Sequence, residues 1–440
     1  MNFDQMRDLL LEQAFQGNLV PQLKEEPTIE PDSKVSGDVA FEIPQKWKWA
    51  TLDDCVVFNP KIQSDDDADV SFIPMQACEA GYVSKLDVTD VRKWNTVKKG
   101  FSKFQDQDVL MAKITPCFQN RKSAIAENLK GGIGAGTTEF HVLRCNKNLL
   151  PKYLLFFLKS SYLICYGVGH FKGTAGQQRI GTSELKNCAV PIPSLNEQRR
   201  IVAKLEESFA EIDRAEKAYR ELQTLTAILR KKILQEAVMG KLVPQLDGEP
   251  AVEQIGDAPE VIPFEIPKKW KWATLDDCVV FNPKIQSDDD ADVSFIPMQA
   301  CKAGYVSKLD VTDVRKWKTV KKGFSKFQDQ DVLMAKITPC FQNRKSAIAE
   351  NLKGGIGAGT TEFHVLRCNK NLLPKYLLFF LKSSYLIRYG VENFKGTAGQ
   401  QRIGTSELKN CAVPVPSLNE QRRIVAKVEE LMAQVDRLAT

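Results

Sequence analysis

The chain has 440 residues and a formal net charge of +6, with 43% hydrophobic and 26% charged residues. This composition is typical of globular domains, and the length is enough for roughly two to four of them. No run of about 18 apolar residues is present, which excludes a membrane-spanning helix. The acidic N-terminal stretch does not fit a secretory signal, so we expect a cytoplasmic protein. The mild positive charge permits an acidic partner such as nucleic acid.

Cysteine spacing argues against a metal site in the chain. None of the eleven cysteines forms a CxxC pair, which is the spacing that tetrahedral zinc sites use. We therefore expect reduced and mostly buried thiols.

Residues 1–23 are expected to form a short helical segment, and residues 24–193 a first domain that mixes helices and strands. Alternating or continuous apolar patterns predict strands at 47–49, 70–75, 109–114, 123–126 and 140–144, and one buried helix at 153–166. Two stretches rich in hydrogen-bond donors, 119–122 and 172–179, are predicted to be loops. The most basic stretch of the domain is 92–103.

Residues 194–240 carry the signals of one long helix. Ser194 and Glu197 form a capping box after Pro193, and Gly240 follows as a C-terminal cap. The apolar residues fall on two heptad lines: Leu205, Ile212, Tyr219 and Ile233, with Thr226 between them, and Ile201, Ala215, Leu222 and Leu229. A helix of about 43 residues would be about 65 Å long. Its narrow apolar stripe predicts a coiled coil.

Residues 241–416 repeat the first domain. At a shift of 223, residues 41–204 align with residues 264–427 without a gap, and only seven positions differ: 45, 79, 95, 165, 169, 170 and 192. The stretch from Gly173 to Pro191 recurs unchanged from Gly396 to Pro414. The repeat is far longer than a solenoid period, so it predicts a duplicated domain.

Residues 417–440 begin a second copy of the long helix that ends early. Under the same shift Phe3, Met6 and Leu10 match Thr226, Leu229 and Ile233, so the N-terminal segment can complete the C-terminal helix in space. The expected fold class is α+β. It has two mixed α/β domains in a pseudo-two-fold arrangement, separated by two long antiparallel helices that form a coiled coil.

The stretch GTAGQQRIGTSELKNCAVPIPSLNEQRRIVAKLEE from Gly173, with its copy from Gly396, resembles the DNA specificity subunits of type I restriction–modification systems. FQDQDVLMAKITPCFQNRKSAI and TTEFHVLR are similar to the target recognition domain of that family. The resemblance covers nearly the whole chain. It implies a non-catalytic subunit whose two recognition domains each read half of a split site on double-stranded DNA, while the helices set their spacing.

The resemblance also implies partners. Two methyltransferase subunits would dock on the helices, where Arg199, Arg200, Lys204, Glu206 and Glu207 are candidate contacts, and restriction subunits could join them. S-adenosylmethionine, ATP and Mg²⁺ would belong to those partners, and the chain itself would hold no cofactor. Family members commonly carry two unlike recognition domains, whereas these two are nearly identical. The near-identity predicts equal half-sites, in inverted orientation, around an unread spacer.

The donor-rich loops are the candidate DNA contacts, because Arg and Lys can bond guanine edges and Asn and Gln can bond adenine edges. In the first domain these are Gln119, Asn120, Arg121, Lys122, Lys172, Thr174, Gln177, Gln178 and Arg179. Their counterparts are Gln342, Asn343, Arg344, Lys345, Lys395, Thr397, Gln400, Gln401 and Arg402. Phosphate contacts are predicted for Lys98, Lys99 and Lys103, and for Lys321, Lys322 and Lys326. The alternative for all of them is a solvated loop or a charged helix face. Since both copies retain these donors, we expect most of the variable positions to lie off the base-reading surface.

Signals for catalysis are weak. Asn59-Pro60-Lys61 lacks the second proline and the aromatic residue of an adenine methyltransferase motif. The glycine cluster at 131–136 favours a mobile loop over a nucleotide site. Glu184-Leu185-Lys186 matches half of a nuclease motif, but the nearest earlier Pro-Asp pair, Pro31-Asp32, is far upstream and absent from the second copy.

Two further groups have ordinary structural readings. The acidic run at 65–69 lacks the Gly and the terminal Glu of a calcium loop, which favours a solvated turn. His141 and His364 lie in strand-like segments, which favours packed or hydrogen-bonded rings over catalysis. A coiled-coil adaptor between proteins, and less favourably a self-contained methyltransferase or nuclease, stay open as alternatives.

Overall fold

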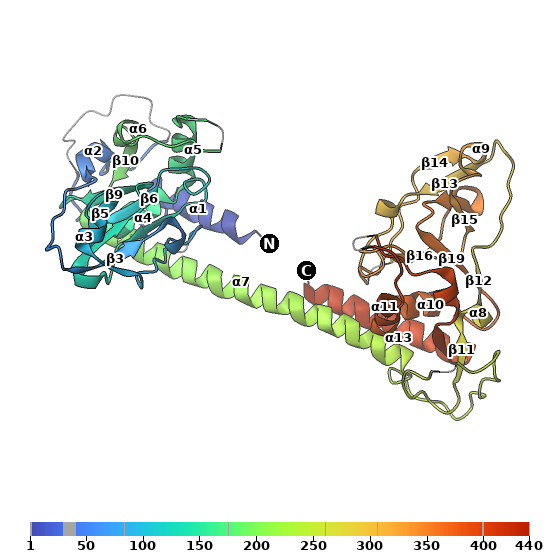
Figure 1. The fold of residues 1–440 in the computed structure, drawn as a ribbon. Helices are drawn as coiled ribbons and strands as arrows, with labels where there is room; N and C mark the ends of the chain where they lie inside the picture. The colour runs from blue at the N-terminus through green and yellow to red at the C-terminus, as the bar shows by residue number, and fades with distance from the viewer. Residues whose placement is uncertain are drawn as a thin grey trace. The chain divides into compact units, whose positions relative to one another are not determined.

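The computed structural model describes residues 2–29, 41–82, 84–174, 176–259, 261–305, 307–397 and 400–439. The chain forms two compact units, Met1–Ala218 and Tyr219–Thr440. Each unit holds one copy of the repeat and one part of the long helix α7 (Leu195–Val238), which is the longest helix in Figure 1. The Pro31-Asp32 pair lies outside the described residues.

Unit 1 begins with α1 (Phe3–Phe15), and its repeat follows in a fixed order of short elements. They are β1 (Lys48–Thr51), α2 (Leu52–Cys55), β2 (Val56–Phe58), β3 (Asp69–Ile73), η1 (Met75–Ala77), β4 (Val91–Lys93), α3 (Trp94–Val97), β5 (Ser102–Gln105), β6 (Val109–Ala112), β7 (Ser123–Ile125), η2 (Lys130–Gly132), β8 (Ile133–Gly136), β9 (Phe140–Cys145), α4 (Pro151–Leu158), α5 (Ser161–Gly169), α6 (Thr182–Lys186) and β10 (Ala189–Ile192).

Unit 2 has the same order of elements. They are β11 (Lys271–Thr274), α8 (Leu275–Cys278), β12 (Val279–Phe281), β13 (Asp292–Ile296), η3 (Met298–Ala300), β14 (Val314–Lys316), α9 (Trp317–Val320), β15 (Ser325–Gln328), β16 (Val332–Ala335), β17 (Ser346–Ile348), η4 (Lys353–Gly355), β18 (Ile356–Gly359), β19 (Phe363–Cys368), α10 (Pro374–Leu381), α11 (Ser384–Glu392), α12 (Thr405–Lys409), β20 (Ala412–Val415) and α13 (Leu418–Ala439). The mixed helix and strand content agrees with the predicted fold class.

The strands of unit 1 form two four-stranded sheets, in the orders β2-β9-β6-β7 and β4-β3-β8-β5, and a two-stranded ladder of β1 and β10. The first sheet is antiparallel, whereas β3 and β8 pair in parallel in the second. Unit 2 repeats this topology with β12-β19-β16-β17, β14-β13-β18-β15 and β11-β20. The register places Gly136 opposite both Ile73 and Ser102, so the ends of β3 and β8 and the start of β5 share one edge.

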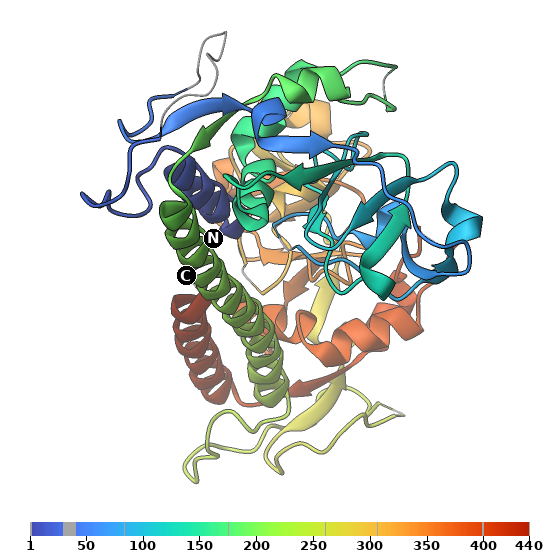
Figure 2. The same ribbon diagram turned by 90° about the vertical axis from the view of Figure 1, so that its left-hand side faces the viewer.

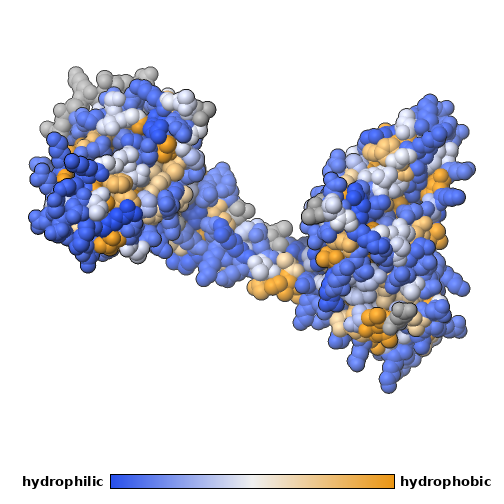
Figure 3. Space-filling model, viewed as in Figure 1, coloured by the Kyte–Doolittle hydropathy of each residue, from blue (hydrophilic) through white to orange (hydrophobic). Residues whose placement is uncertain are grey.

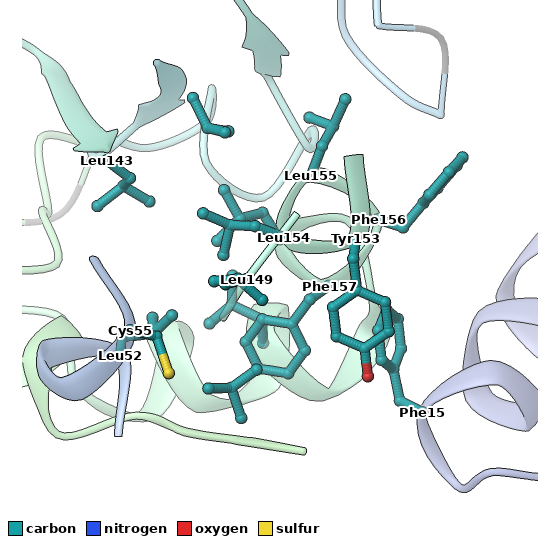
Figure 4. Close-up of a cluster of buried hydrophobic side chains, with 14 of the residues drawn as sticks. Phe15, Leu52, Cys55, Leu143, Leu149, Tyr153, Leu154, Leu155, Phe156 and Phe157 are labelled. Atoms are coloured by element: carbon teal, nitrogen blue, oxygen red, sulfur yellow. The ribbon is translucent and has the colours of Figure 1, made fainter. Parts of the chain in front are cut away.

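The core of unit 1 is centred on α4, where Tyr153 and Phe157 are fully buried. Phe15 from α1 contacts both rings, with centroid distances of 5.4 Å each (Figure 4). The Tyr153 hydroxyl donates to the Pro191 carbonyl at 2.8 Å, which satisfies its polar end in the apolar interior. The core therefore joins the N-terminal helix to the repeat of unit 1.

Each unit contains an antiparallel pair of helices. In unit 1 the Arg7 guanidinium binds Asp213 and Glu216 of α7 at 2.6 and 2.8 Å, while Arg200 donates to the Pro21 carbonyl. In unit 2 Arg230 of α7 binds Asp436 of α13 at 2.6 Å, and Arg423 donates to the Pro244 carbonyl. Figure 2 shows α13 alongside the end of α7. The antiparallel pairing is thus confirmed within each unit, and the pseudo-two-fold relation of the repeats stays a prediction.

The long helix begins and ends close to its predicted bounds, because its caps are local. Ser194 Oγ accepts from the Glu197 amide, and Gly240 has a φ of 70°. On the first heptad line Leu205, Ile212, Thr226 and Ile233 are buried and Tyr219 is half-buried. The second line was predicted less well: Ile201 is buried and Leu222 half-buried, but Ala215 and Leu229 are exposed. A partner helix therefore covers only part of this second line.

Two predictions inside the repeat are wrong. The helix expected at 153–166 is two helices, because the chain turns at Lys159-Ser160 and the Ser160 hydroxyl caps α5 by accepting from the Leu163 amide. The glycine cluster at 131–136 is not a mobile loop, since most of it forms the central strand β8. A Cβ on Gly134 would lie 2.2 Å from the Phe104 ring, so glycine is required for this strand to pack. The predicted strands agree with β1, β3, β6, β7 and β9 within a few residues.

The cysteines and the helices fit the sequence-based expectations. All eleven cysteines are free thiols, six of them are buried, and Cys165 is exposed. Among the residues that the structure describes, no helix is both long enough and apolar enough to cross a membrane. The faces visible in Figure 3 are mostly hydrophilic, with small apolar patches.

Candidate nucleic-acid interface

The two donor-rich loops, which the sequence predicts separately, are joined in the structure. Lys172 and Arg179 exchange both backbone hydrogen bonds at 2.9 Å, so these two residues pair as the base of a hairpin. The Thr115 amide donates to the Gln178 carbonyl at 2.9 Å, which fixes the hairpin to the start of the turn at 115–122. Unit 2 repeats this contact between Thr338 and Gln401 at 2.9 Å. The turn and the hairpin therefore form one surface, named here the recognition surface.

Buried side chains hold the recognition surface from below. Phe118 of the turn and Phe171 before the hairpin meet edge to face at 5.3 Å. His141 on β9 is 2% exposed, and its Nε2 donates to the Ile180 carbonyl at 3.0 Å when that nitrogen carries the proton. Burial lowers the pKa of His141 to about 4, so the ring is neutral near pH 7. The prediction of a hydrogen-bonded structural histidine is confirmed, and His364 has the same contact with Ile403.

Gln119 and Asn120 are the most accessible donors of the turn. Both residues are exposed, and their side chains bond to no other residue in the described part of the chain. The backbone below them is held, because the Asn120 carbonyl accepts from the Gly81 amide at 2.7 Å. Gln342 and Asn343 are exposed in the same way in unit 2. An amide fixed at its base and free at its tip is suited to read a base edge.

Arg121 and Lys122 are half-buried and already engaged. Lys122 Nζ donates to the Met75 carbonyl at 3.1 Å, as Lys345 does to Met298. Arg121 has a φ of 56°, and its Nε donates to the Lys159 carbonyl at 2.8 Å. Arg344 has the matching φ of 57° and donates to Lys382 at 3.0 Å.

A buried lysine supports the same turn. Lys159 is 0% exposed, and its Nζ donates to the Gly81 and Arg121 carbonyls at 2.8 and 3.0 Å. Burial lowers the pKa of Lys159 to about 8. The turn is therefore anchored to the core through polar contacts that its own sequence does not indicate.

The cations of the hairpin are paired with glutamates. Lys172 binds Glu184, and its hydrogen bond is the main reason that the pKa of Glu184 falls to about 2. Arg179 binds both carboxylate oxygens of Glu139, at 2.9 and 3.0 Å. In unit 2 the same pairs join Lys395 to Glu407 and Arg402 to Glu362.

The neutral donors of the hairpin differ in exposure. Thr174 and Gln177 are exposed, whereas Gln178 is half-buried. Thr397 and Gln400 are exposed in unit 2, and Gln401 is half-buried. The neutral donors therefore differ from Lys172 and Lys395 in being unpaired among the described residues, since those two lysines are also exposed but bind Glu184 and Glu407.

The predicted phosphate contacts lie between the end of α3 and the first residues of β5. Lys98 is paired with Asp66 at 2.8 Å, and Lys103 donates to the Phe101 carbonyl. Lys99 is exposed and has no ion-pair partner among the described residues. In unit 2 Lys321 binds Asp289 at 2.7 Å, Lys326 donates to Phe324, and Lys322 is exposed. Lys99 and Lys322 are therefore the most available cations of this stretch.

Sequence reasoning missed the acids that neutralise these cations. Glu139, Glu184 and Asp66 are far from their partners in the chain, so spacing alone carries no signal for them. Opposite charge in the two stretches does give a signal for pairing. The acidic run at 65–69 binds the basic stretch at 92–103 through the ion pairs Asp66–Lys98 and Asp69–Lys93. The predicted solvated turn is thus also an ion-paired one.

Some variable positions lie next to the recognition surface. Positions 165, 169 and 170 are in or just after α5, which leads into the hairpin. His170 Nδ1 lies 2.8 Å from the Tyr166 carbonyl, and its counterpart Asn393 donates to the Tyr389 carbonyl at the same distance. The substitution therefore keeps the contact that ends the helix.

The half nuclease motif has structural partners instead. Glu184 binds Lys172, and Lys186 binds Asp53 at 2.9 Å. In the described part of the chain no group of three His, Cys, Asp or Glu residues could hold a metal ion.

The model of the type I restriction modification DNA specificity domain matches the chain twice, over residues 44–224 and 267–439. The chain belongs to this family. Each match covers one repeat and the adjoining part of a long helix, so the family assignment rests on both units. Family membership supports the prediction of a specificity subunit without catalysis of its own.

Named relatives agree with this assignment. The chain is 27% identical to the type I restriction enzyme EcoEI specificity subunit of Escherichia coli, over 98% of this chain and 89% of that protein. It is 40% identical to the EcoAI specificity subunit of Escherichia coli over 48% of this chain and 40% of that protein.

Solved structures share the fold of the specificity subunit. The HsdS subunit from Thermoanaerobacter tengcongensis has a TM-score of 0.59 at 19% identity, with 91% of this chain and 92% of that chain covered. A chain from a structure of complex assembly and conformational transition in the type I R-M system has a TM-score of 0.65 at 19% identity, with 91% and 93% covered.

Proposed function

We propose that this specificity subunit reads two DNA half-sites, one with each recognition surface. The observation that carries the proposal is the joined turn and hairpin, which both units build with the same backbone contact at 2.9 Å. Each surface presents exposed amides and a hydroxyl at Gln119, Asn120, Thr174 and Gln177 or at their counterparts. Neutral donors on a fixed backbone are suited to discriminate bases, whereas exposed Lys99 and Lys322 are suited to contact phosphates.

Equal surfaces imply equal half-sites. The residues that form the turn and the hairpin are identical in the two copies. The half-sites would therefore share one base sequence, in inverted orientation, around a spacer that no side chain reads. This symmetry rests on the predicted pseudo-two-fold relation of the repeats.

The helices would carry the partners. Two methyltransferase subunits would dock on the helix pairs, with Arg199, Arg200, Lys204, Glu206 and Glu207 as candidate contacts, and restriction subunits could complete the complex. Of these, Arg200 already binds Glu26 at 2.8 Å, and Lys204 binds Glu207 at 2.8 Å. S-adenosylmethionine, ATP and Mg²⁺ would be held by the partners, and the complex would act in the cytoplasm.

Selection of duplexes from a random DNA pool tests the proposal, with the methyltransferase partner present. We expect enrichment of a split inverted repeat with identical halves. Replacing Gln119, Asn120, Gln342 and Asn343 by alanine should change the enriched bases. Replacing Lys99 and Lys322 by alanine should instead lower affinity for all sequences and reduce the salt slope by about 2.

The outcome also decides between this proposal and its rivals. Enrichment of two unlike halves would support the DNA-binding role but refute the prediction that both half-sites have the same base sequence. No enrichment by the folded complex would refute the DNA-binding role and favour a coiled-coil adaptor between proteins. Methyl transfer or DNA cleavage by the isolated chain would favour a self-contained enzyme.

A further inference from the structure

An acid of α1 holds the turn arginine of unit 1. Arg121 Nη2 donates to Asp8 Oδ1 at 2.8 Å. Ser161 Oγ donates to the same oxygen at 2.9 Å, and the Arg121 guanidinium also lies 4.8 Å from the centre of the Tyr82 ring. One carboxylate therefore receives a guanidinium and a hydroxyl donor beside a tyrosine ring.

Unit 2 keeps these three residues but not the acid. Arg344, Ser384 and Tyr305 are identical to their counterparts at the shift of 223, whereas Lys231 stands where unit 1 has Asp8. The two helices are otherwise equivalent, since Arg230 binds Asp436 as Arg7 binds Asp213. Buried residues follow the same register, with Leu11 and Ala14 matched by Leu234 and Ala237.

The arginine and the tyrosine of unit 2 keep the arrangement that they have in unit 1. The Arg344 guanidinium lies 5.0 Å from the centre of the Tyr305 ring, and that of Arg121 lies 4.8 Å from the Tyr82 ring. In the described part of unit 2 no carboxylate binds Arg344. The Ser384 hydroxyl is buried without a hydrogen-bond partner, which is a costly state for a polar atom.

We propose that Arg344, Ser384, Tyr305 and Lys231 form an oxyanion site that binds a phosphate of the DNA. Asp8 fills the corresponding site in unit 1, where Arg121 and Ser161, the counterparts of Arg344 and Ser384, both donate to its carboxylate. Lys231 puts a positive charge at the helix position where unit 1 has a negative one. A phosphate offers the charge and the several acceptor oxygens that arginine favours.

The position of the site favours DNA as the source of the phosphate. Arg344 belongs to the turn that presents exposed Gln342 and Asn343, which are the predicted base contacts. The inference therefore rests on the proposed function. It also implies that the two recognition units bind DNA unequally, although their turns and hairpins have the same sequence.

Substitution of Lys231 in α7 tests the proposal. Lys231→Asp should supply the missing acid, close the site, and lower the DNA affinity of the complex about tenfold, with a salt slope smaller by about 1. Arg344→Ala should have a similar effect. Arg121→Ala should leave the salt slope nearly unchanged, because Asp8 already neutralises that cation.

Lys232→Asp is the matched control, since it makes the same charge change one residue away. The Lys232 side chain is 69% exposed, and its Nζ lies 3.8 Å from Glu236 Oε1. Equal thermal midpoints would show that the variants are folded. In the opposite direction, Asp8→Lys should open the site of unit 1 and raise the salt slope by about 1.

Three results would overturn the proposal. Equal affinities and salt slopes for Lys231→Asp and Lys232→Asp would show that no local phosphate contact was lost. Unchanged DNA binding with weaker methyltransferase association would identify the anion as a carboxylate of that partner. A wild-type complex that selects no DNA would refute the proposed function itself, and that result is visible before any variant is compared.

Discussion

Acidification should destabilise each unit through one buried histidine. His141 and His364 are both 2% exposed, and burial lowers the pKa of each from 6.5 to about 4. The folded state therefore favours the neutral ring. Its stabilising contribution is complete above about pH 6.5 and is lost as the pH falls toward 4. At about pH 5 the loss amounts to about 2 kcal/mol of unfolding free energy per histidine.

Urea unfolding between about pH 7.5 and pH 5 measures this loss. His141→Gln and His364→Gln should each remove about half of the pH dependence, and the double variant should remove most of it. His170→Gln is the control, because His170 is the third histidine of the chain and is exposed. The reasoning is refuted if the double variant keeps the wild-type dependence, or if His170→Gln removes it.

Three further changes test other parts of the structure. Gly134→Ala should destabilise unit 1 by about 2 kcal/mol or more in urea unfolding, since its Cβ would meet the Phe104 ring, whereas Gly169→Ala, which faces open space, should be nearly neutral. Asp108→Asn should cost about 3 kcal/mol in the same assay, because Asp108 is 1% exposed and binds Arg144 through both oxygens at 2.7 and 2.8 Å. Cys165 should react with a maleimide faster than the other ten thiols, and mass spectrometry of Cys165→Ser should show that this fast modification is gone.

Features with local signals could be predicted from the sequence. The long helix begins within a residue of its predicted start, because Ser194 and Glu197 are neighbours that cap it directly. The strand at 133–136 could not be predicted in this way. Its glycines look like a flexible loop until the ring of Phe104, which belongs to another strand, is placed against Gly134. The break between α4 and α5, by contrast, has a local signal that the prediction missed, since Ser160 caps α5 three residues before Leu163.

The candidate site also has some features that the local sequence indicates and others that depend on tertiary contacts. The sequence indicates which stretches are rich in donors, but not which donors are free. Arg179 and Lys172 look as available as Gln177 in the sequence, yet Glu139 and Glu184 pair with them from elsewhere in the fold. Since charge pairing depends on tertiary contacts, the exposed amides stand out as base-reading candidates only in the structure.

The two copies of the turn show the effect of tertiary contacts directly, because their local sequences are identical. Arg121 and Arg344 have the same neighbours in the chain, nearly the same φ, and the same contact with a lysine carbonyl. They differ because a helix outside the near-identical segment brings Asp8 to one and carries Lys231 at the matching position of the other. The sequence of the turn alone therefore does not fix its charge. The helix that supports each turn also decides how much positive charge the turn carries.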